Sequence, residues 1–380
     1  MDKATLLERH QLRYARRGLL YGMLSGIMWG FQGPVLYVLA MASGWFLDPY
    51  RNSFWVGCLI CLVFTCAHEM FASLWVLLLN GMTGRLKEIG RALRTRPGRL
   101  AIVSAVFGGP IGSCGYILGM YLAGGTYAMV ISAIYPAVGA LLGRIFLKER
   151  INARVWAGIF CCLIGAVVVN FGGFEEAALS KTFILGIIFS ALPVIGWGAG
   201  GIISNFGMDM VDPDIVLWIR ETASFVLEFV VVLLGGSILI AHLSGGSETY
   251  LMMDGVTEAV FRLDWSAGWR LFGRFLTEGK AVFWAAVAAA FGGFSYVLFY
   301  RAMNMIGSSR GMAFNVTYAM WGIPGYYLCG LLAKSLCHYD YGYSITPVML
   351  AGAVVITVGA ILVSVNPREL AHLRDGGSGR

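Results

Sequence analysis

Apolar residues along this chain are grouped in long stretches, which short polar or basic segments separate. A helix needs about 20 apolar residues to cross the hydrocarbon core of a bilayer. Ten stretches approach or exceed this length, at approximately 18–42, 54–80, 100–122, 125–147, 153–171, 183–206, 215–243, 281–303, 311–334 and 344–365. The pattern therefore predicts an all-α polytopic membrane protein with ten transmembrane helices.

Two parts of the chain carry the same sparse pattern of glycine and aromatic residues. The shared positions are Phe107, Gly108, Gly109, Tyr116, Tyr135 and Gly139 in the first part and Phe291, Gly292, Gly293, Tyr300, Tyr318 and Gly322 in the second. The offset is 184 residues at the start of the pattern and 183 at its end. Trp29-Gly30 and Trp197-Gly198 form a second such pair. Internal repeats in an apolar chain indicate a transporter with its site where the repeats meet.

Composition supports a membrane protein and argues against a nucleic-acid partner. Hydrophobic residues make up 58% of the 380 residues and charged residues only 13%. A soluble chain of this size could not bury so much apolar surface in one core. The net charge of +7 comes from basic residues that gather at the ends of apolar stretches. That distribution is typical of topology signals, so we expect contact with membrane lipids and none with nucleic acid.

The basic segments also predict the orientation. The first 17 residues, the segment 85–99 and Lys148-Glu149-Arg150 are basic, and ten spans place all three on one side. The positive-inside rule assigns that side to the cytoplasm. Both termini are then cytoplasmic, in an inner or plasma membrane. Each half has an odd number of spans, so the second half must enter the membrane in the opposite sense, as an inverted repeat.

The expected organisation has two repeats between two terminal segments. A basic cytoplasmic arm, 1–17, precedes a first five-helix repeat, 18–171. The second five-helix repeat covers 183–365, and 366–380 forms a cytoplasmic tail. An external insert, 244–280, interrupts the second repeat between its second and third spans. Its aromatic and basic residues fit either an amphipathic segment in the membrane interface or a solvated loop.

One motif carries a family resemblance. The sequence Phe-Leu-Lys-Glu-Arg-Ile-Asn-Ala-Arg-Val-Trp-Ala-Gly (146–158) leads into Ile164-Gly165-Ala166, and Trp29-Gly30 lies in the first span. With ten spans in two halves, these features resemble the EamA-like branch of the drug/metabolite transporter superfamily over 18–171 and 183–365. The resemblance implies an inverted-repeat bundle with a central cavity and alternating access. The second half departs from it, because Ala333-Lys334-Ser335 replaces the Lys-Glu-Arg turn.

Ionisable residues inside predicted spans are costly and need an explanation. Glu69, His68 and Glu228 are the candidates for proton coupling, and Glu69 is also a candidate for binding a cationic substrate. His68 and Glu69 are adjacent on a helix and diverge by about 100°, so they face different neighbours. The alternative is a structural role in hydrogen bonds between helices. Arg220 and Glu221 are interpreted as an ion pair.

Aromatic and amide side chains complete the candidate substrate site. Tyr and Trp inside a bundle need polar partners, and a ring of them can hold an organic cation. The alternative is packing and interfacial anchoring. The predicted substrate-binding residues are Trp29, Gln32, Glu69, Tyr116, Tyr135, Trp197, Tyr300, Asn315, Tyr318 and Trp321.

The function that these features favour is secondary transport of a small polar organic metabolite by alternating access. An amine or organic cation is the favoured substrate, whereas a neutral or anionic substrate would use Arg220 or the amino-terminal ends of broken helices. Coupling to protons and facilitated diffusion both stay open as modes of transport. A receptor or scaffold that binds a partner through 244–280 is the alternative. The sequence contains no phosphate-binding loop, metal cluster or hydrolase motif, so no enzyme activity, cofactor or metal is predicted. It specifies no oligomeric state.

Overall fold

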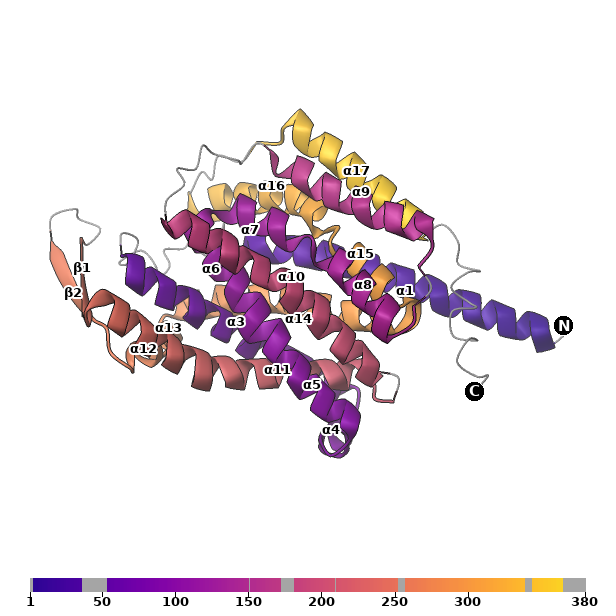
Figure 1. Ribbon diagram of the computed structural model, residues 1–380, viewed down its shortest axis with the longest axis horizontal. Coiled ribbons are helices and arrows are strands. Elements are labelled where there is room, and N and C mark those ends of the chain that lie inside the picture. Colours follow the sequence, from indigo (N-terminus) through magenta and orange to yellow (C-terminus); the bar gives the residue numbers. More distant parts are fainter. Residues whose placement is uncertain are drawn as a thin grey trace.

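The computed structural model describes residues 3–35, 53–149, 151–171, 181–208, 210–251, 257–338 and 344–364. The predicted tail, 366–380, and the first two residues of the basic arm lie outside this range. Helices dominate the described chain, and one short hairpin is the sole sheet found in it. The elements are arranged in a bundle of long, roughly aligned helices (Figure 1).

The helices of the first half follow the predicted spans closely. They are α1 (Lys3–Pro34), α3 (Phe54–Met82), α4 (Leu86–Leu93), α5 (Arg96–Val106), the π-helical segment η3 (Phe107–Ser113), α6 (Cys114–Ala123), α7 (Gly125–Ser132), α8 (Tyr135–Phe146) and α9 (Ala153–Val169). Helices α5, η3 and α6 form one continuous rod. Its π-helical part coincides with Gly108-Gly109-Pro110, where proline removes a backbone donor.

The second half contains the remaining elements. They are α10 (Lys181–Met208), α11 (Pro213–Leu227), the π-helical segment η5 (Glu228–Val232), α12 (Leu233–Ser244), β1 (Ser247–Leu251), β2 (Glu258–Arg262), α13 (Ala267–Thr277), α14 (Gly279–Ile306), α15 (Ser308–Asn315), α16 (Tyr318–Cys337) and α17 (Pro347–Ser364).

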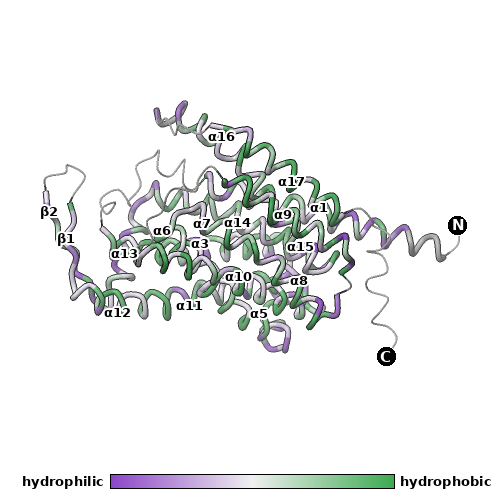
Figure 2. The backbone as a smooth tube through the Cα atoms, turned by 45° about the horizontal axis from the view of Figure 1, so that its top comes forward, coloured by the Kyte–Doolittle hydropathy of each residue, from purple (hydrophilic) through white to green (hydrophobic). Residues whose placement is uncertain are grey.

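Seven helical stretches of the described chain are long and apolar enough to cross a bilayer. They are Phe54–Met82, Arg96–Ala123, Gly125–Phe146, Thr182–Met208, Pro213–Ser244, Gly279–Ile306 and Pro347–Ser364. The other predicted spans overlap α1, the shorter apolar helix α9, and the pair α15 and α16. Hydrophobic residues follow the long helices, whereas hydrophilic residues gather around α4, the start of α1 and the hairpin (Figure 2). The chain is therefore an integral, polytopic membrane protein.

Helix pairs in one part of the bundle have counterparts in the other. Helix α1 packs along α14, and α10 packs in the same way along α5, η3 and α6. Helix α3 contacts α14, while α11 contacts α5. Helices α9 and α17, the last of each half, pack along one another (Figure 1). In these pairs, a helix from one half of the sequence packs against a helix from the other half.

Small residues allow α9 and α17 to approach closely. A Cβ atom at Gly158 would lie 2.7 Å from the carbonyl oxygen of Gly359, and one at Gly165 would lie 2.9 Å from that of Gly352. No side chain fits at these positions without moving the backbones apart. Packing of this kind replaces the hydrophobic drive that is absent between helices in lipid.

The insert between α12 and α14 is ordered where the structure describes it. Strands β1 and β2 pair antiparallel, with Ser247 opposite Arg262 and Leu251 opposite Glu258. The buried face of α13, with Leu271, Phe272 and Phe275, packs against α3, α12 and α14. The apolar side of this helix therefore contacts the protein's own bundle.

Glu248 on β1 joins the hairpin to the start of α3. Its carboxylate accepts hydrogen bonds from the backbone N–H groups of Phe54, at 2.8 Å, and Val56, at 2.9 Å. It also accepts a hydrogen bond from the Ser53 hydroxyl. A carboxylate at a helix N-terminus satisfies backbone donors and interacts favourably with the helix dipole. These hydrogen bonds therefore hold the hairpin against the bundle.

Candidate functional site

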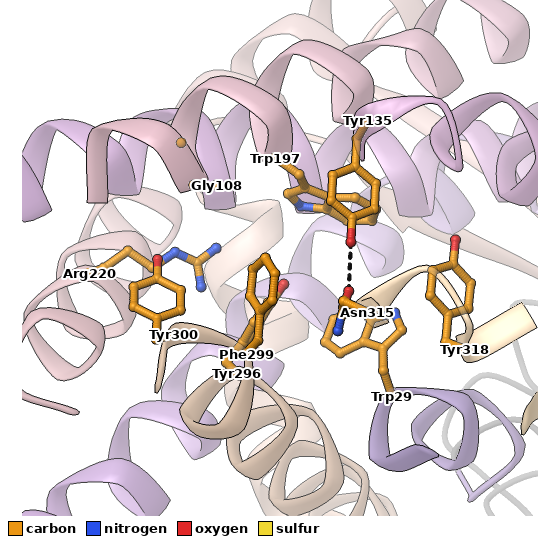
Figure 3. A pocket seen from close by; sticks show the side chains of 12 residues that line it. Trp29, Gly108, Tyr135, Trp197, Arg220, Tyr296, Phe299, Tyr300, Asn315 and Tyr318 are labelled. Atoms are coloured by element: carbon orange, nitrogen blue, oxygen red, sulfur yellow. Dashed lines mark hydrogen bonds between the residues drawn. The ribbon is translucent and has the colours of Figure 1, made fainter. Parts of the chain in front are cut away.

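A small central cavity lies where helices of both halves meet. Its volume is about 30 Å³. Its walls are formed by Trp29, Gly108, Tyr135, Trp197, Gly200, Gly201, Arg220, Tyr296, Phe299, Tyr300, Asn315 and Tyr318. Arg220 reaches one end of this cavity and Tyr318 lies at the other, with Trp29 and Trp197 between them (Figure 3). Since its volume is about that of one water molecule, the cavity has no room for a larger molecule at its centre.

Aromatic rings make up most of the cavity wall. The rings of Trp29 and Trp197, which occupy equivalent positions in the two halves, meet edge to face with centroids 6.3 Å apart. Trp29 also lies 4.9 Å from Tyr296, and Trp197 lies 5.9 Å from Tyr135. Ring faces carry negative electrostatic potential, so such a group attracts a cation. The guanidinium of Arg220 already lies over the ring of Tyr296, 4.9 Å from its centre.

A chain of buried hydrogen bonds links the two halves beside the aromatic rings. The Tyr135 hydroxyl, on α8, donates to Asn315 Oδ1, on α15, at 2.7 Å (Figure 3). Asn315 Nδ2 donates in turn to the hydroxyl of Ser25 at 2.7 Å. Ser25 is within 3.2 Å of the Ser295 hydroxyl. A buried amide that is paired at both ends is held in one orientation, so Asn315 is a fixed part of the wall.

A larger cavity adjoins the central one. It has a volume of about 330 Å³ and shares Trp29 and Tyr318 with the central cavity. Gln32 and Tyr116, both predicted substrate-binding residues, line this larger cavity. Its wall includes Pro34 at the end of α1 and Met349 at the beginning of α17. The larger cavity therefore lies toward one face of the bundle, and α1 begins and α17 ends at the opposite face. Trp29 and Tyr318 lie between the central cavity and the larger cavity.

A cluster of buried charges lies behind Arg220. Glu69, Glu221 and Glu228 are each 0% exposed. The Arg220 guanidinium is in contact with Glu221, and it lies 3.7 Å from Glu69 Oε2. Glu69 accepts a hydrogen bond from Ser113 at 3.3 Å. Glu228 lies close enough to Glu69 and Arg220 to interact electrostatically, and neither of its oxygens has a hydrogen-bond partner within the described chain. One guanidinium thus lies among three carboxyl groups.

His68 and Glu69 point to different neighbours, as their spacing on a helix requires. The His68 ring meets Trp29 edge to face, with centroids 6.4 Å apart. A Cβ atom at Gly292 would lie 2.5 Å from His68 Nε2, so the glycine makes room for the imidazole. No hydrogen-bond partner for Nε2 is found among the described residues. His68 therefore supports the aromatic wall, while Glu69 belongs to the charge cluster.

The predicted substrate-binding residues fall into four locations. Trp29, Tyr135, Trp197, Tyr300, Asn315 and Tyr318 line the central cavity, whereas Gln32 and Tyr116 line the larger one. Glu69 is separated from the central cavity by Arg220. Trp321 lines a third, lateral cavity of about 480 Å³ between α1, α16 and α17. The structure thus brings six of the ten together.

Six of the twelve residues that line the central cavity were not among the predicted substrate-binding residues: Gly108, Gly200, Gly201, Arg220, Tyr296 and Phe299. Arg220 was interpreted only as half of an ion pair or as a site for anions, yet its guanidinium forms one end of the cavity. Tyr296 precedes Tyr300 by one helical turn on α14, and this spacing is the signal that both face the same way. No group of three or more His, Cys, Asp or Glu side chains in the described chain is placed to hold a metal ion.

A sequence comparison indicates a membrane transporter of the drug/metabolite type. Residues 16–171 match the sequence profile of the EamA-like transporter family, whose members are transporters and not enzymes. This match covers the first half of the predicted bundle and confirms there the resemblance that the Lys-Glu-Arg turn indicated.

Two further comparisons extend over nearly the whole chain. The chain is 24% identical over 348 residues to Protein LicB of Haemophilus influenzae, which covers 91% of this chain and 97% of that protein. A solved crystal structure of a protein aligns with a TM-score of 0.56 and 14% sequence identity, over 96% of this chain and 99% of the other. At that identity the structural likeness concerns the fold alone.

Proposed function

We propose that the protein is a secondary transporter that moves a small organic cation, such as an amine, by alternating access. The observation that carries this proposal is the aromatic central cavity, which both halves build and which joins a larger cavity through Trp29 and Tyr318. The central space of about 30 Å³ is too small for an organic molecule, and the larger cavity has the volume of an ordinary ligand pocket. Substrate therefore enters the larger cavity and reaches the centre when Trp29 and Tyr318 move apart.

Two inverted five-helix repeats account for the arrangement of helices. The equivalent tryptophans, Trp29 and Trp197, are in contact, and the equivalent tyrosines, Tyr135 and Tyr318, line the same cavity. The helix pairs between the two halves support the same symmetry. Inverted repeats provide two related conformations, one open to each side of the membrane. The side where α1 begins and α17 ends, with the basic α4, is then cytoplasmic.

The charge cluster favours a cation over an anion. Arg220 reaches the cavity, but its charge is opposed by Glu69 and Glu221, and Glu228 adds a third carboxyl group. A fully ionised cluster would have a net negative charge in a buried place, which is costly. A cationic substrate reduces this cost, and so does a proton. The cluster therefore holds at least one proton when substrate is absent, which makes a proton the natural coupling ion.

Uptake by purified protein in proteoliposomes tests the proposal. Labelled amines, carboxylic acids and sugars are offered with and without an imposed proton gradient. We expect uptake of amines alone, and a proton dependence that Glu69→Gln abolishes. Uptake of anions but not cations, unaffected by Glu69→Gln, would contradict the cation site. Amine uptake that is indifferent to pH would contradict proton coupling alone.

A pair of tryptophan variants tests the location of the site. Trp197→Leu removes one face of the central cavity, whereas Trp321→Leu changes a residue of the lateral cavity. We expect the first to lower amine uptake about tenfold or more, because a buried cation–π contact contributes about 2 kcal/mol, and the second to change it less than about twofold. Equal losses in the two variants would argue against the central cavity as the site.

A further inference from the structure

Glu149, in the Lys-Glu-Arg turn after α8, forms a cap on a helix of the other half. Its carboxylate accepts hydrogen bonds from the backbone N–H groups of Ser308, at 2.6 Å, and Ser309, at 3.1 Å, and from the Ser309 hydroxyl. The two serines begin α15, the helix that ends at Asn315 in the cavity wall. Lys148 has a left-handed backbone, with φ of 54°, which turns the chain so that Glu149 reaches α15. The cap therefore joins the end of the first half to a cavity helix of the second.

The capped helix closes one route to the cavity. All eight residues of α15 are buried. Met312, 0% exposed, extends from α15 to contact Gly139 on α8, where a Cβ atom would overlap its sulfur. Its methyl group packs against Gly201 on α10, which lines the cavity. Met312 thus lies between the central cavity and the end of the bundle where Glu149 is found.

The equivalent helix on the opposite side is open. A shift of 183 residues superimposes α15 on α7, Gly125–Ser132, of which only Ala128 and Ser132 are buried. Gly125 and Thr126, at the start of α7, line the larger cavity. Within the described chain, no side chain accepts a hydrogen bond from their backbone N–H groups.

The sequence explains why the second half makes no matching cap in the described chain. The 183-residue offset places Leu332 at the position of Glu149, whereas the sequence pattern alone aligned the turn with Ala333-Lys334-Ser335. Neither alignment gives a carboxylate, and both fall inside α16, which continues to Cys337 where α8 has already ended. The left-handed turn residue of this half is His338, so the turn comes about two helical turns later than in the first half. Within the residues that the structure describes, the carboxylate at 149 therefore has no counterpart in the second half.

We propose that Glu149 is a positioning residue that holds α15 in its closed place and so makes the conformation open to the opposite face the resting state. This inference rests on the alternating access proposed above. When the cap is weakened, α15 separates from α8 and α10, Met312 leaves its place, and the cavity opens on the side of Glu149. The protein then spends more time in the conformation that has the larger cavity closed.

Thiol labelling of the reconstituted protein tests this without a substrate. Ala313→Cys, next to Met312 on α15 and likewise 0% exposed, reports access from the Glu149 side in inside-out vesicles. Thr126→Cys reports access from the other side in right-side-out vesicles. A membrane-impermeant maleimide is used, and mass spectrometry of the labelled peptides separates these positions from the native cysteines. Each reporter is combined with Glu149→Gln, and with Glu88→Gln as a control that removes an exposed carboxylate on α4.

Glu149→Gln should speed labelling at 313 about five- to tenfold, the factor expected from loss of one charged helix cap, and should slow labelling at 126. Glu88→Gln should change neither rate. Unchanged rates in Glu149→Gln, or rates that rise at both positions, would overturn the proposal. If Glu149→Gln does not fold, Ser309→Ala removes one of the three donors and should shift both rates in the same directions by less; no shift there overturns the proposal as well. Failure of the cation-transport proposal would appear only in the uptake measurements and not in the labelling rates.

Discussion

Two elbows with the same backbone occupy opposite sides of the central cavity. We call Gly124–Tyr135 the first elbow and Gly307–Tyr318 the second. Each begins with a glycine in an unusual conformation, φ 96° and ψ 150° at Gly124, φ 88° and ψ 156° at Gly307. An eight-residue helix follows in each, and a tyrosine begins the next helix. The second elbow helix is entirely buried, whereas the first has two buried residues.

The two elbows have the same backbone but differ in what their side chains contact. Backbone donors at a buried helix start need partners, and Glu149 supplies them for the second elbow. The start of the first elbow helix borders the larger cavity, where solvent can reach its donors. Under the alternating access proposed above, the two elbows would close opposite sides of the cavity, and side chains that differ between them would determine which side is closed.

The largest expected effect comes from the glycine that opens each elbow. Its backbone conformation lies in a region that only glycine populates readily, so alanine costs about 1–3 kcal/mol in either elbow. At Gly307 a Cβ atom would also lie 3.3 Å from the Glu149 carboxylate, whereas nothing lies within 4 Å of one at Gly124. We expect Gly307→Ala to lower the thermal unfolding temperature in detergent clearly more than Gly124→Ala.

The same two variants separate local strain from the cap. Adding Glu149→Gln to Gly307→Ala should cost less than the two single losses together, because the second change removes a contact that the first has already disturbed. Glu149→Gln should remain additive with Gly124→Ala. Equal unfolding temperatures for the two glycine variants would contradict the expected energetic difference between the elbows.

A second pair of equivalent glycines tests the packing of the elbows. A Cβ atom at Gly139 would overlap the sulfur of Met312, whereas one at Gly322 has only the Gly30 carbonyl oxygen nearby, at 3.9 Å. We expect Gly139→Ala to destabilise the protein by about 1–3 kcal/mol, the range for overpacking a well-filled site, and Gly322→Ala by less than about 0.5 kcal/mol. Thermal unfolding measures both changes.

Labelling gives an independent check of the Gly139 effect. If Met312 is displaced rather than the helices, Gly139→Ala should also speed thiol labelling of Ala313→Cys from the Glu149 side. The Gly322→Ala control should leave that rate unchanged. An unaltered rate in Gly139→Ala would mean that Met312 does not close this side.

Sequence alone predicted the helices and the repeated tyrosines, because apolar length and the spacing of rare residues are local signals. It did not predict the elbows. The stretches 125–147 and 311–334 are continuously apolar, so nothing in their periodicity marks the interruptions after Ser132 and Asn315. Trp321 illustrates another limit, since Tyr318 and Trp321 are one turn apart but line different cavities. Arg220 was assigned its partner Glu221, but Glu69 joins them only through the packing of α3 against α11.

The smallest expected effect concerns the tyrosines that end the elbows. Tyr135 donates to Asn315 of the opposite elbow at 2.7 Å. The reciprocal pair is Tyr318 and Ser132. The side chain of Ser132 is shorter than that of Asn315, and it lies near the Tyr318 hydroxyl without a hydrogen bond of normal geometry. Tyr135→Phe leaves the buried Oδ1 of Asn315 unpaired and should cost about 1–2 kcal/mol, while Tyr318→Phe should cost less than about 0.5 kcal/mol. Chemical unfolding in detergent measures both.

A double substitution shows whether the asymmetry belongs to the hydrogen bond. Tyr135→Phe combined with Asn315→Leu removes both partners, and replacing both members of a buried pair by apolar groups is much less costly than removing one. We therefore expect the double variant to recover part of the stability that Tyr135→Phe loses. Tyr318→Phe with Ser132→Ala should show no such recovery, because no hydrogen bond of normal geometry joins Tyr318 and Ser132. Equal coupling in the two pairs would mean that the elbows differ in their caps and packing but not in their link to each other.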